Sequence, residues 1–221
     1  MSPHPPLPAA GEVHVWKLKQ EDGEATRLSP AEVERMERYR FANDRHRYCA
    51  TQSHKRTILS RYLGERPEDL SFTENQQGKP ALPGLEFSIS HTAGLSLLAV
   101  TTRNPVGIDI ERIQIPEDLD SLAERIASKA EWAHFLSLSN EDKSNLFFQL
   151  WTAKEAFVKA LGTGFEMEPH ELQTELPSLA SISHLGKNRH LLLPFNAGPG
   201  YVAHLASKEA FTKVTSFDFP D

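Results

Sequence analysis

The stretch from Val106 to Ile113, VGIDIERI, predicts a β-strand, because its β-branched residues favour extended backbone. Alternate side chains of a strand point to opposite faces, so the valine and isoleucines at 106, 108 and 110 would share one face. Gly107, Asp109 and Glu111 would share the other. Two neighbouring carboxylates repel each other unless a positive charge lies between them. The stretch is therefore either an edge strand with its charges in solvent or one wall of a cation site.

A second informative stretch runs from Trp151 to Gly162, WTAKEAFVKALG, and predicts an amphipathic helix. At about 100° per residue, the apolar stripe of this helix would comprise Leu146, Leu150, Ala153, Phe157 and Leu161. Trp151, Glu155 and Lys159 would lie one turn apart on the opposite face. In isolation, that face would be a solvent-exposed Glu–Lys pair.

The carboxylate of Glu155 would be a third oxygen ligand if it met Asp109 and Glu111. Carboxylate oxygens are the ligands that Mg²⁺ prefers, and this cation usually shares its shell with substrate phosphates. The sequence has no tight His/Cys cluster, which disfavours zinc. The three carboxylates therefore make a magnesium site the alternative to a solvated strand and helix.

A third stretch, Phe87–Thr92 (FSISHT), follows Gly78-Lys79-Pro80 and predicts a strand that ends near His91. Ser88 and Ser90 would face one way and His91 the other. A hydroxyl and an imidazole beside a turn suit an anionic oxygen, although a structural Ser–His pair is the alternative. The chain carries no G-x-S-x-G elbow, P-loop or G-x-G-x-x-G fingerprint, so these hydrolase and nucleotide-binding classes are not indicated.

The composition is that of an ordinary globular protein, with 221 residues, 39% hydrophobic and 24% charged. The net charge of -6 disfavours a nucleic-acid partner held by overall basicity. A single cysteine, Cys49, excludes an intramolecular disulfide and fits a reducing compartment. The sequence predicts neither a signal peptide nor a membrane span, so we expect a cytoplasmic protein.

The order of elements predicts an α+β chain of two similar halves, residues 1–105 and 106–221. Each half would place its helices before most of its strands. The expected helices cover about 30–39, 44–63, 119–137 and 142–161. The expected strands cover about 12–18, 69–73, 86–91, 95–102, 106–113, 171–175, 190–195, 200–206 and 212–219.

Taken in order, GKP, FSISHT, VGIDIE and WTAKEAFVKALGTG resemble the Sfp-type 4′-phosphopantetheinyl transferases over residues from about 40 to 165. Those enzymes move the phosphopantetheine arm of coenzyme A onto a serine of an acyl or peptidyl carrier protein. The resemblance implies a pseudo-twofold pair of α+β halves, with coenzyme A bound between them. It also implies a monomer, because one chain supplies both halves.

The resemblance assigns roles to individual residues of this sequence. Asp109, Glu111 and Glu155 match the Mg²⁺ carboxylates, and Asp109 also lies at the coenzyme. Lys159 matches the lysine on the phosphates, while Lys79, Ser90 and His91 match further phosphate contacts. Lys154, on the flank of the same helix as Lys159, is a further coenzyme-binding candidate near the phosphates. Arg47 and Tyr48 fall at the nucleotide end. Catalysis would rest on Glu155, Glu111 and Lys159, with Glu155, Glu111 or a metal-bound water as the general base.

The implied reaction is attack by the carrier serine on the β-phosphate of coenzyme A, with release of 3′,5′-ADP. Carriers are generally acidic, so a local basic patch is expected. Its candidates are Arg45, Lys55, Arg56 and Arg61, which are alternatively a solvated helix face. The carrier could serve fatty-acid, polyketide or nonribosomal-peptide synthesis. Two other classes stay open: a non-catalytic coenzyme A-binding module and a Mg²⁺-dependent phosphohydrolase, although no Nudix-like acidic box is present.

Overall fold

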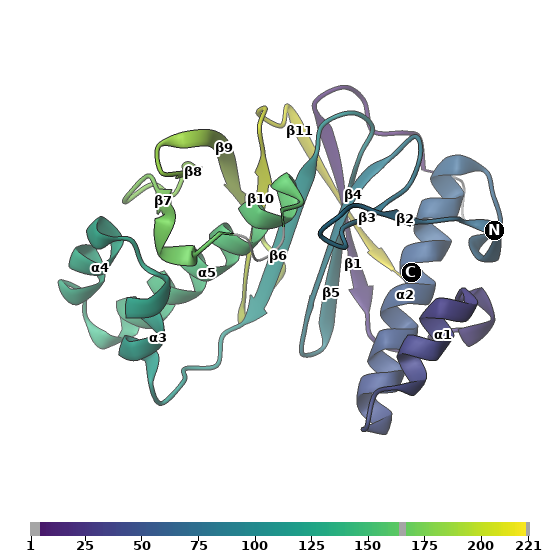
Figure 1. Cartoon of the computed structure of the whole chain (residues 1–221), viewed down its shortest axis with the longest axis horizontal. Coiled ribbons are helices and arrows are strands. Elements are labelled where there is room, and N and C mark those ends of the chain that lie inside the picture. The colour runs from purple at the N-terminus through teal and green to yellow at the C-terminus, as the bar shows by residue number, and fades with distance from the viewer. Residues whose placement is uncertain (1–4, 164–166, 220–221) are drawn as a thin grey trace.

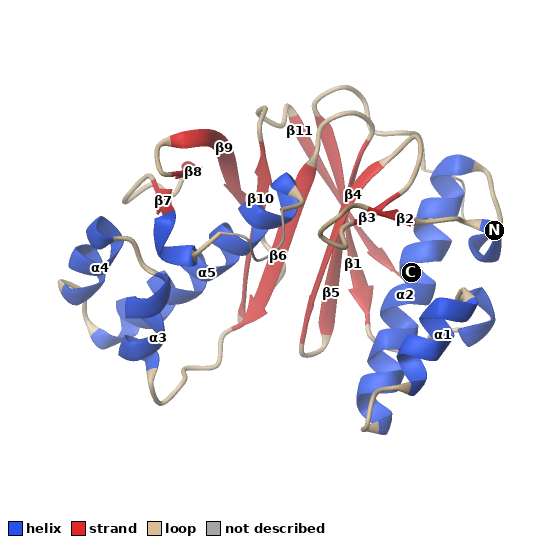
Figure 2. Ribbon diagram, in the orientation of Figure 1, coloured by secondary structure: helices blue, strands red, loops and turns tan. Residues whose placement is uncertain are grey.

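The computed structural model describes residues 5–163 and 167–219 and shows two sheets side by side, each with helices on its outer side (Figure 1). In Figure 2, α1 and α2 flank one sheet and α3, α4 and α5 flank the other. The helices are α1 (Pro30–Glu37), α2 (Ala42–Leu63), α3 (Leu119–Ile126), α4 (Lys129–Leu136) and α5 (Asn140–Leu161), with short 3₁₀ turns η1 (Ala25–Arg27), η2 (Pro67–Asp69) and η4 (Pro169–Glu171). The strands are β1 (Glu12–Lys19), β2 (Thr73–Glu74), β3 (Pro80–Ala81), β4 (Glu86–Thr92), β5 (Leu95–Thr101), β6 (Val106–Arg112), β7 (Leu172–Thr174), β8 (Ser181–His184), β9 (Lys187–Pro194), β10 (Tyr201–Ser207) and β11 (Lys213–Phe219).

The first sheet has the order β11-β1-β5-β4 and the second has the order β6-β10-β9-β8-β7. The run β1-β5-β4 has the same antiparallel connections as β6-β10-β9, so the two halves repeat one arrangement. The last strand breaks the repeat. The sequence placed residues 213–219 in the second half, but β11 pairs in parallel with β1 and thus completes the first sheet.

The helices repeat as well. α1 and α4 each have eight residues and begin with a capping box, in which an N-cap serine and the third helical residue, a glutamate, bond each other's backbone N–H. α2 and α5 each have 22 residues and end at a glycine with φ of 70°, a left-handed conformation that glycine adopts at little cost. The predicted α+β class of two similar halves is thereby confirmed. Among the described helices, none has the length and apolarity needed to cross a bilayer.

Several elements differ from the expectation. The predicted strand at 69–73 is mostly irregular, because only Asp69 lies in η2 and only Thr73 lies in β2. The predicted helix at 119–137 is two helices, because Ser128 caps a new helix at Lys129. The strands β3 and β8 had no counterparts in the prediction.

The apolar face of β6 lies in a core that the two sheets share. Ile108 and Ile110 are fully buried and belong to one cluster with Val13, Val15 and Leu97 of the first sheet. The opposite face of β6 lies against α5. There a Cβ added to Gly107 would come within 1.8 Å of the carbonyl oxygen of Ala156, so this strand and helix are in backbone contact. Gly107, Asp109 and Glu111 are thus on the helix side.

A buried hydrogen bond also holds α5 to β10. Thr152 Oγ1 lies 2.8 Å from His204 Nδ1, and both side chains are buried. Burial lowers the pKa of His204 to about 4, so the imidazole is neutral at neutral pH.

This buried histidine predicts a loss of stability in acid. Because the folded pKa of His204 lies below its unfolded value, its contribution is complete above about pH 6.5 and is lost as the pH falls toward 4. The loss should reach about 3 kcal/mol in the free energy of unfolding. Denaturant titrations at pH 7 and pH 4.5 should show a weaker pH dependence for His204→Asn than for the wild type. Identical dependences would contradict the assignment.

Candidate active site

The two sheets meet at their edge strands, β4 and β6, through a row of hydroxyl side chains. Ser88 Oγ accepts from the backbone N–H of Ile108 at 3.1 Å, and Ser90 Oγ donates to Asp109 Oδ1 at 2.6 Å. Thr92 Oγ1 donates to Glu111 Oε2 at 3.2 Å. The three hydroxyls alternate along β4, so they share the face that the sequence predicted for Ser88 and Ser90. They bring β4 to the two carboxylates of β6.

Asp109 is the centre of this meeting point and is 4% exposed. Its Oδ1 accepts from Ser90 and also from Lys159 Nζ of α5, at 2.6 Å. Its Oδ2 is buried and has no hydrogen-bond partner in the described part of the chain. An unpaired buried acceptor costs roughly 1–3 kcal/mol. A cation would satisfy this oxygen, so the donor chemistry fits a hard metal ion.

Glu111 and Glu155 are half-buried, and the negative charge of Asp109 acts on both. Burial, and next the charge of Asp109, raise the pKa of both glutamates. Glu111 also accepts from Trp151 Nε1 at 3.3 Å. Mutual repulsion among the three carboxylates would be relieved by a divalent ion. As they stand, no three His, Cys, Asp or Glu side chains within residues 5–163 and 167–219 form a ready metal cluster. The predicted ligand roles stay predictions.

Two cavities adjoin β4. One, of about 270 Å³, is lined by Lys79, Ile89, Glu155 and Lys159 among others. Burial lowers the pKa of Lys79, whose ammonium donates to the carbonyl of Val106 in a long hydrogen bond of 3.5 Å. An anion in this cavity would therefore gain two lysines.

The second cavity, also about 270 Å³, is lined by Arg47, Tyr48, His91 and Thr92 among others. The predicted residues thus divide between two cavities, with Ser90 and Asp109 at the strand edge between the two halves. Sequence reasoning missed Arg35, whose guanidinium lies 5.8 Å from the ring centre of Tyr48. The only sequence signal for a role of Arg35 beside Tyr48 was its position in the helix before the one that carries Arg47, and that signal was weak.

The predicted coenzyme contact of Lys154 is wrong. Its ammonium is buried and donates to Glu131 Oε2 at 2.6 Å, to the carbonyl of Ile126 at 2.6 Å and to that of Pro169 at 2.9 Å. All three protons are used inside the protein, so none is available for a phosphate.

Two members of the expected basic patch are also misplaced. Lys55 and Arg56 are 5% and 2% exposed and both pair with Glu32. Both side chains therefore lie in the interior around one carboxylate and cannot form a docking surface for an acidic carrier.

Comparison with known proteins identifies the class. The model of the 4′-phosphopantetheinyl transferase superfamily matches residues 105–205. The chain is 36% identical over 186 residues to the 4′-phosphopantetheinyl transferase HetI of Nostoc sp., covering 74% of this chain and 78% of that protein. It is 29% identical over 192 residues to the 4′-phosphopantetheinyl transferase Sfp of Bacillus subtilis, covering 83% and 84%. Against holo-[acyl-carrier-protein] synthase of Thermotoga maritima, the TM-score is 0.36 at 22% identity, over 49% of this chain and 65% of that one. The chain belongs to the 4′-phosphopantetheinyl transferase superfamily, as the sequence motifs predicted.

Proposed function

We propose that this protein transfers the 4′-phosphopantetheine arm of coenzyme A to a serine of an apo acyl or peptidyl carrier protein. The relatives HetI and Sfp carry the name of this activity. The observation that carries the proposal is the meeting of Asp109, Ser90 and Lys159, with hydrogen bonds of 2.6 Å, where β4, β6 and α5 come together.

In this proposal coenzyme A lies along β4. The cavity with Lys79 and Lys159 takes the pyrophosphate, where two ammonium groups offset its charge. Ser90 and His91 contact the phosphates at the strand end, and Arg47 and Tyr48 hold the nucleotide end. The first half (1–105) thus binds most of the coenzyme, and the second half (106–221, apart from β11) supplies the carboxylates and Lys159.

Asp109, Glu111 and Glu155 would hold Mg²⁺, as the unpaired Asp109 oxygen and the raised pKa values of both glutamates support. When bound, the ion supplies charge neutralisation for the pyrophosphate. Freed from Asp109, the Lys159 ammonium would offset the charge that develops on the leaving oxygen.

The transfer itself forms one bond and breaks one. The carrier serine oxygen bonds to the β-phosphorus, while the bond from that phosphorus to the bridging oxygen breaks and 3′,5′-ADP leaves. The serine proton goes to a carboxylate, for which Glu155 and Glu111 are the candidates. We further propose that the protein is a monomer, because one chain supplies both sides of the site. A cytoplasmic location would fit its single cysteine.

The direct test is a mass measurement. Purified protein is incubated with coenzyme A, Mg²⁺ and several apo carrier proteins, and the mass of each carrier is followed. We expect a gain of one phosphopantetheine arm, lost with a chelator and in Glu155→Gln but kept in Glu124→Gln, a matched change on the exposed face of α3. If coenzyme A binds but no carrier gains mass, the chain is better described as a coenzyme A-binding module.

A further inference from the structure

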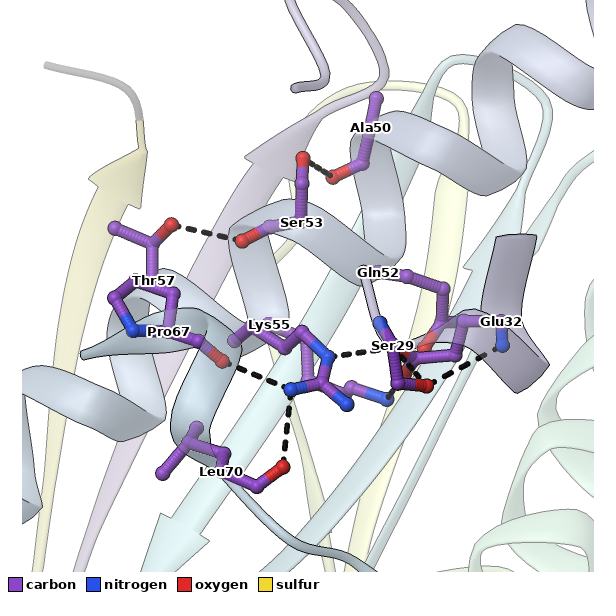
Figure 3. A network of polar contacts seen from close by, with 10 residues as sticks. Ser29, Glu32, Ala50, Gln52, Ser53, Lys55, Thr57, Pro67 and Leu70 are labelled. Atoms are coloured by element: carbon purple, nitrogen blue, oxygen red, sulfur yellow. Dashed lines mark hydrogen bonds and ion pairs between the residues drawn. The ribbon is translucent and has the colours of Figure 1, made fainter. Parts of the chain in front are cut away.

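In each half of the molecule, an ion pair in the interior connects the long helix, α2 or α5, to the short capped helix before it, and the two pairs have the same arrangement. In the first half, Glu32 is the capping-box glutamate of α1 and accepts from Arg56 Nε of α2 at 2.5 Å. Arg56 Nη1 also donates to the carbonyls of Pro67 and Leu70 at 2.8 and 3.1 Å. Figure 3 shows this network, with Glu32 at one side of it and the carbonyls of Pro67 and Leu70 at the other.

The second half repeats the design with a different cation. Glu131 is the capping-box glutamate of α4 and accepts from Lys154 Nζ of α5. Arg56 and Lys154 each stand eight residues before the glycine that ends their helix. Each also donates to the carbonyl of the proline that begins the following 3₁₀ turn, Pro67 in η2 or Pro169 in η4.

The second-half pair, Lys154–Glu131, is more buried than the first-half pair. Glu131 is 0% exposed, and its other oxygen accepts from the backbone N–H and the hydroxyl of Thr174, at 2.8 and 2.6 Å. The pair therefore joins α5 to α4, to η4 and to β7. Apolar packing of α5 on the sheet is not directional, whereas these hydrogen bonds depend on distance and angle. They fix how α5 is turned and how far it slides along its axis.

The position of the pair connects it to the reaction centre. Lys154 directly precedes Glu155, and Lys159 follows one turn later and bonds Asp109 at 2.6 Å. A small rotation or slide of α5 would move both side chains relative to the carboxylates of β6.

We propose that the Lys154–Glu131 pair positions α5 for arm transfer, so that Glu155 and Lys159 meet Asp109 in the productive geometry. This inference rests on the proposed function. Lys154 and Glu131 are positioning residues that never touch the coenzyme or the carrier. The first-half pair positions α1 and α2 instead, and it does not set the distance between Glu155 and Asp109.

The test compares two matched double variants, Lys154→Met/Glu131→Gln and Arg56→Met/Glu32→Gln. The second-half variant removes both charges of its pair and leaves no lone buried charge, whereas the first-half variant also takes Glu32 away from the buried Lys55, which makes it the more severe control for a loss of stability. The expected kcat for the second-half variant is about 10- to 100-fold below wild type, the scale on which a misplacement of about 1 Å acts, with KM for coenzyme A little changed. The first-half variant should keep the wild-type kcat at saturating coenzyme A. Both are assayed at a temperature where circular dichroism shows them folded.

The outcomes separate the explanations. A folded second-half variant with wild-type kcat, or equal kcat losses in both variants, would show a merely stabilising pair and overturn the inference. A wild-type protein that transfers no arm would refute the proposed function instead. Should the second-half double variant not fold, Lys154→Met alone keeps Glu131 as the capping-box residue and as the acceptor for Thr174, so the carboxylate retains three hydrogen-bond donors. It should show the same loss of kcat at unchanged KM, and a wild-type kcat there would equally overturn the inference.

Discussion

Replacing Asp109 by asparagine should slow arm transfer by roughly 10²- to 10³-fold, the range observed when one preorganised electrostatic group is removed from an active site. Asparagine has nearly the same shape, so the fold should persist. It can still accept from Ser90 through its amide oxygen, but it loses the charge that pairs with Lys159 at 2.6 Å. It would also place an amide on the Oδ2 side, which now has no partner in the described part of the chain.

The same substitution has a readout that does not depend on activity. The charge of Asp109 helps to raise the pKa of Glu111 and of Glu155, after burial as the larger cause. In the metal-free protein, the pKa of both glutamates should therefore fall in Asp109→Asn, which a carboxyl-detected NMR titration would measure. Asp218→Asn, at an exposed residue of β11, is the matched control. A transfer rate within about threefold of wild type, with both pKa values unchanged, would remove Asp109 from the centre of the site.

Local periodicity was enough to predict which side chains of β6 and of α5 share a face. The two-residue repeat of β6 placed Gly107, Asp109 and Glu111 on one face, and the helical repeat placed Trp151, Glu155 and Lys159 on another. The structure brings these two faces together, as the bonds of Trp151 with Glu111 and of Lys159 with Asp109 show. Periodicity works here because both elements are long enough to define a face.

Contacts between distant residues were the part that the sequence left undetermined. A helical repeat puts Lys154 on the flank of α5 but is silent about Glu131, which lies in a different helix. Likewise, β11 reads as an ordinary strand, and only tertiary pairing places it beside β1 at the other end of the chain. Buried cations such as Lys154 and Arg56 look like surface residues in a sequence because lysine and arginine are rarely buried without a partner.

The repeated halves differ where the first strand of each antiparallel run packs against the long helix. β1 occupies in the first sheet the position that β6 has in the second, and it also faces a 22-residue helix. On the matching face of β1, His14 Nδ1 and Trp16 Nε1 each lie 2.8 Å from the hydroxyl of Tyr62 in α2. The carboxylate on this face, Glu12, accepts from Lys213 and Thr215 of β11. The carboxylates of β6 instead bond to Lys159 and Trp151 of the long helix.

Substituting Gly107 by alanine should be among the most destabilising single changes in the protein. The added Cβ would lie 1.8 Å from the carbonyl oxygen of Ala156 and 2.5 Å from the backbone nitrogen of Ala160. Both are backbone atoms of α5, so no side-chain rotation relieves the overlap and the helix itself must move. We expect the free energy of unfolding to fall by about 3 kcal/mol or more, at the upper end for overpacked cores.

A matched glycine separates this overlap from ordinary backbone strain. Gly186 has φ of 73° and open space around its Cβ position, so Gly186→Ala should cost only about 1 kcal/mol or slightly more. Denaturant unfolding of both variants gives the comparison, and equal losses would contradict the close approach of α5 to β6. Ala156→Gly should not rescue Gly107→Ala, because it deletes a methyl group and leaves the obstructing carbonyl in place. A displaced α5 carries Glu155 and Lys159 with it, so any Gly107→Ala protein that remains folded should also transfer the arm more slowly than Gly186→Ala.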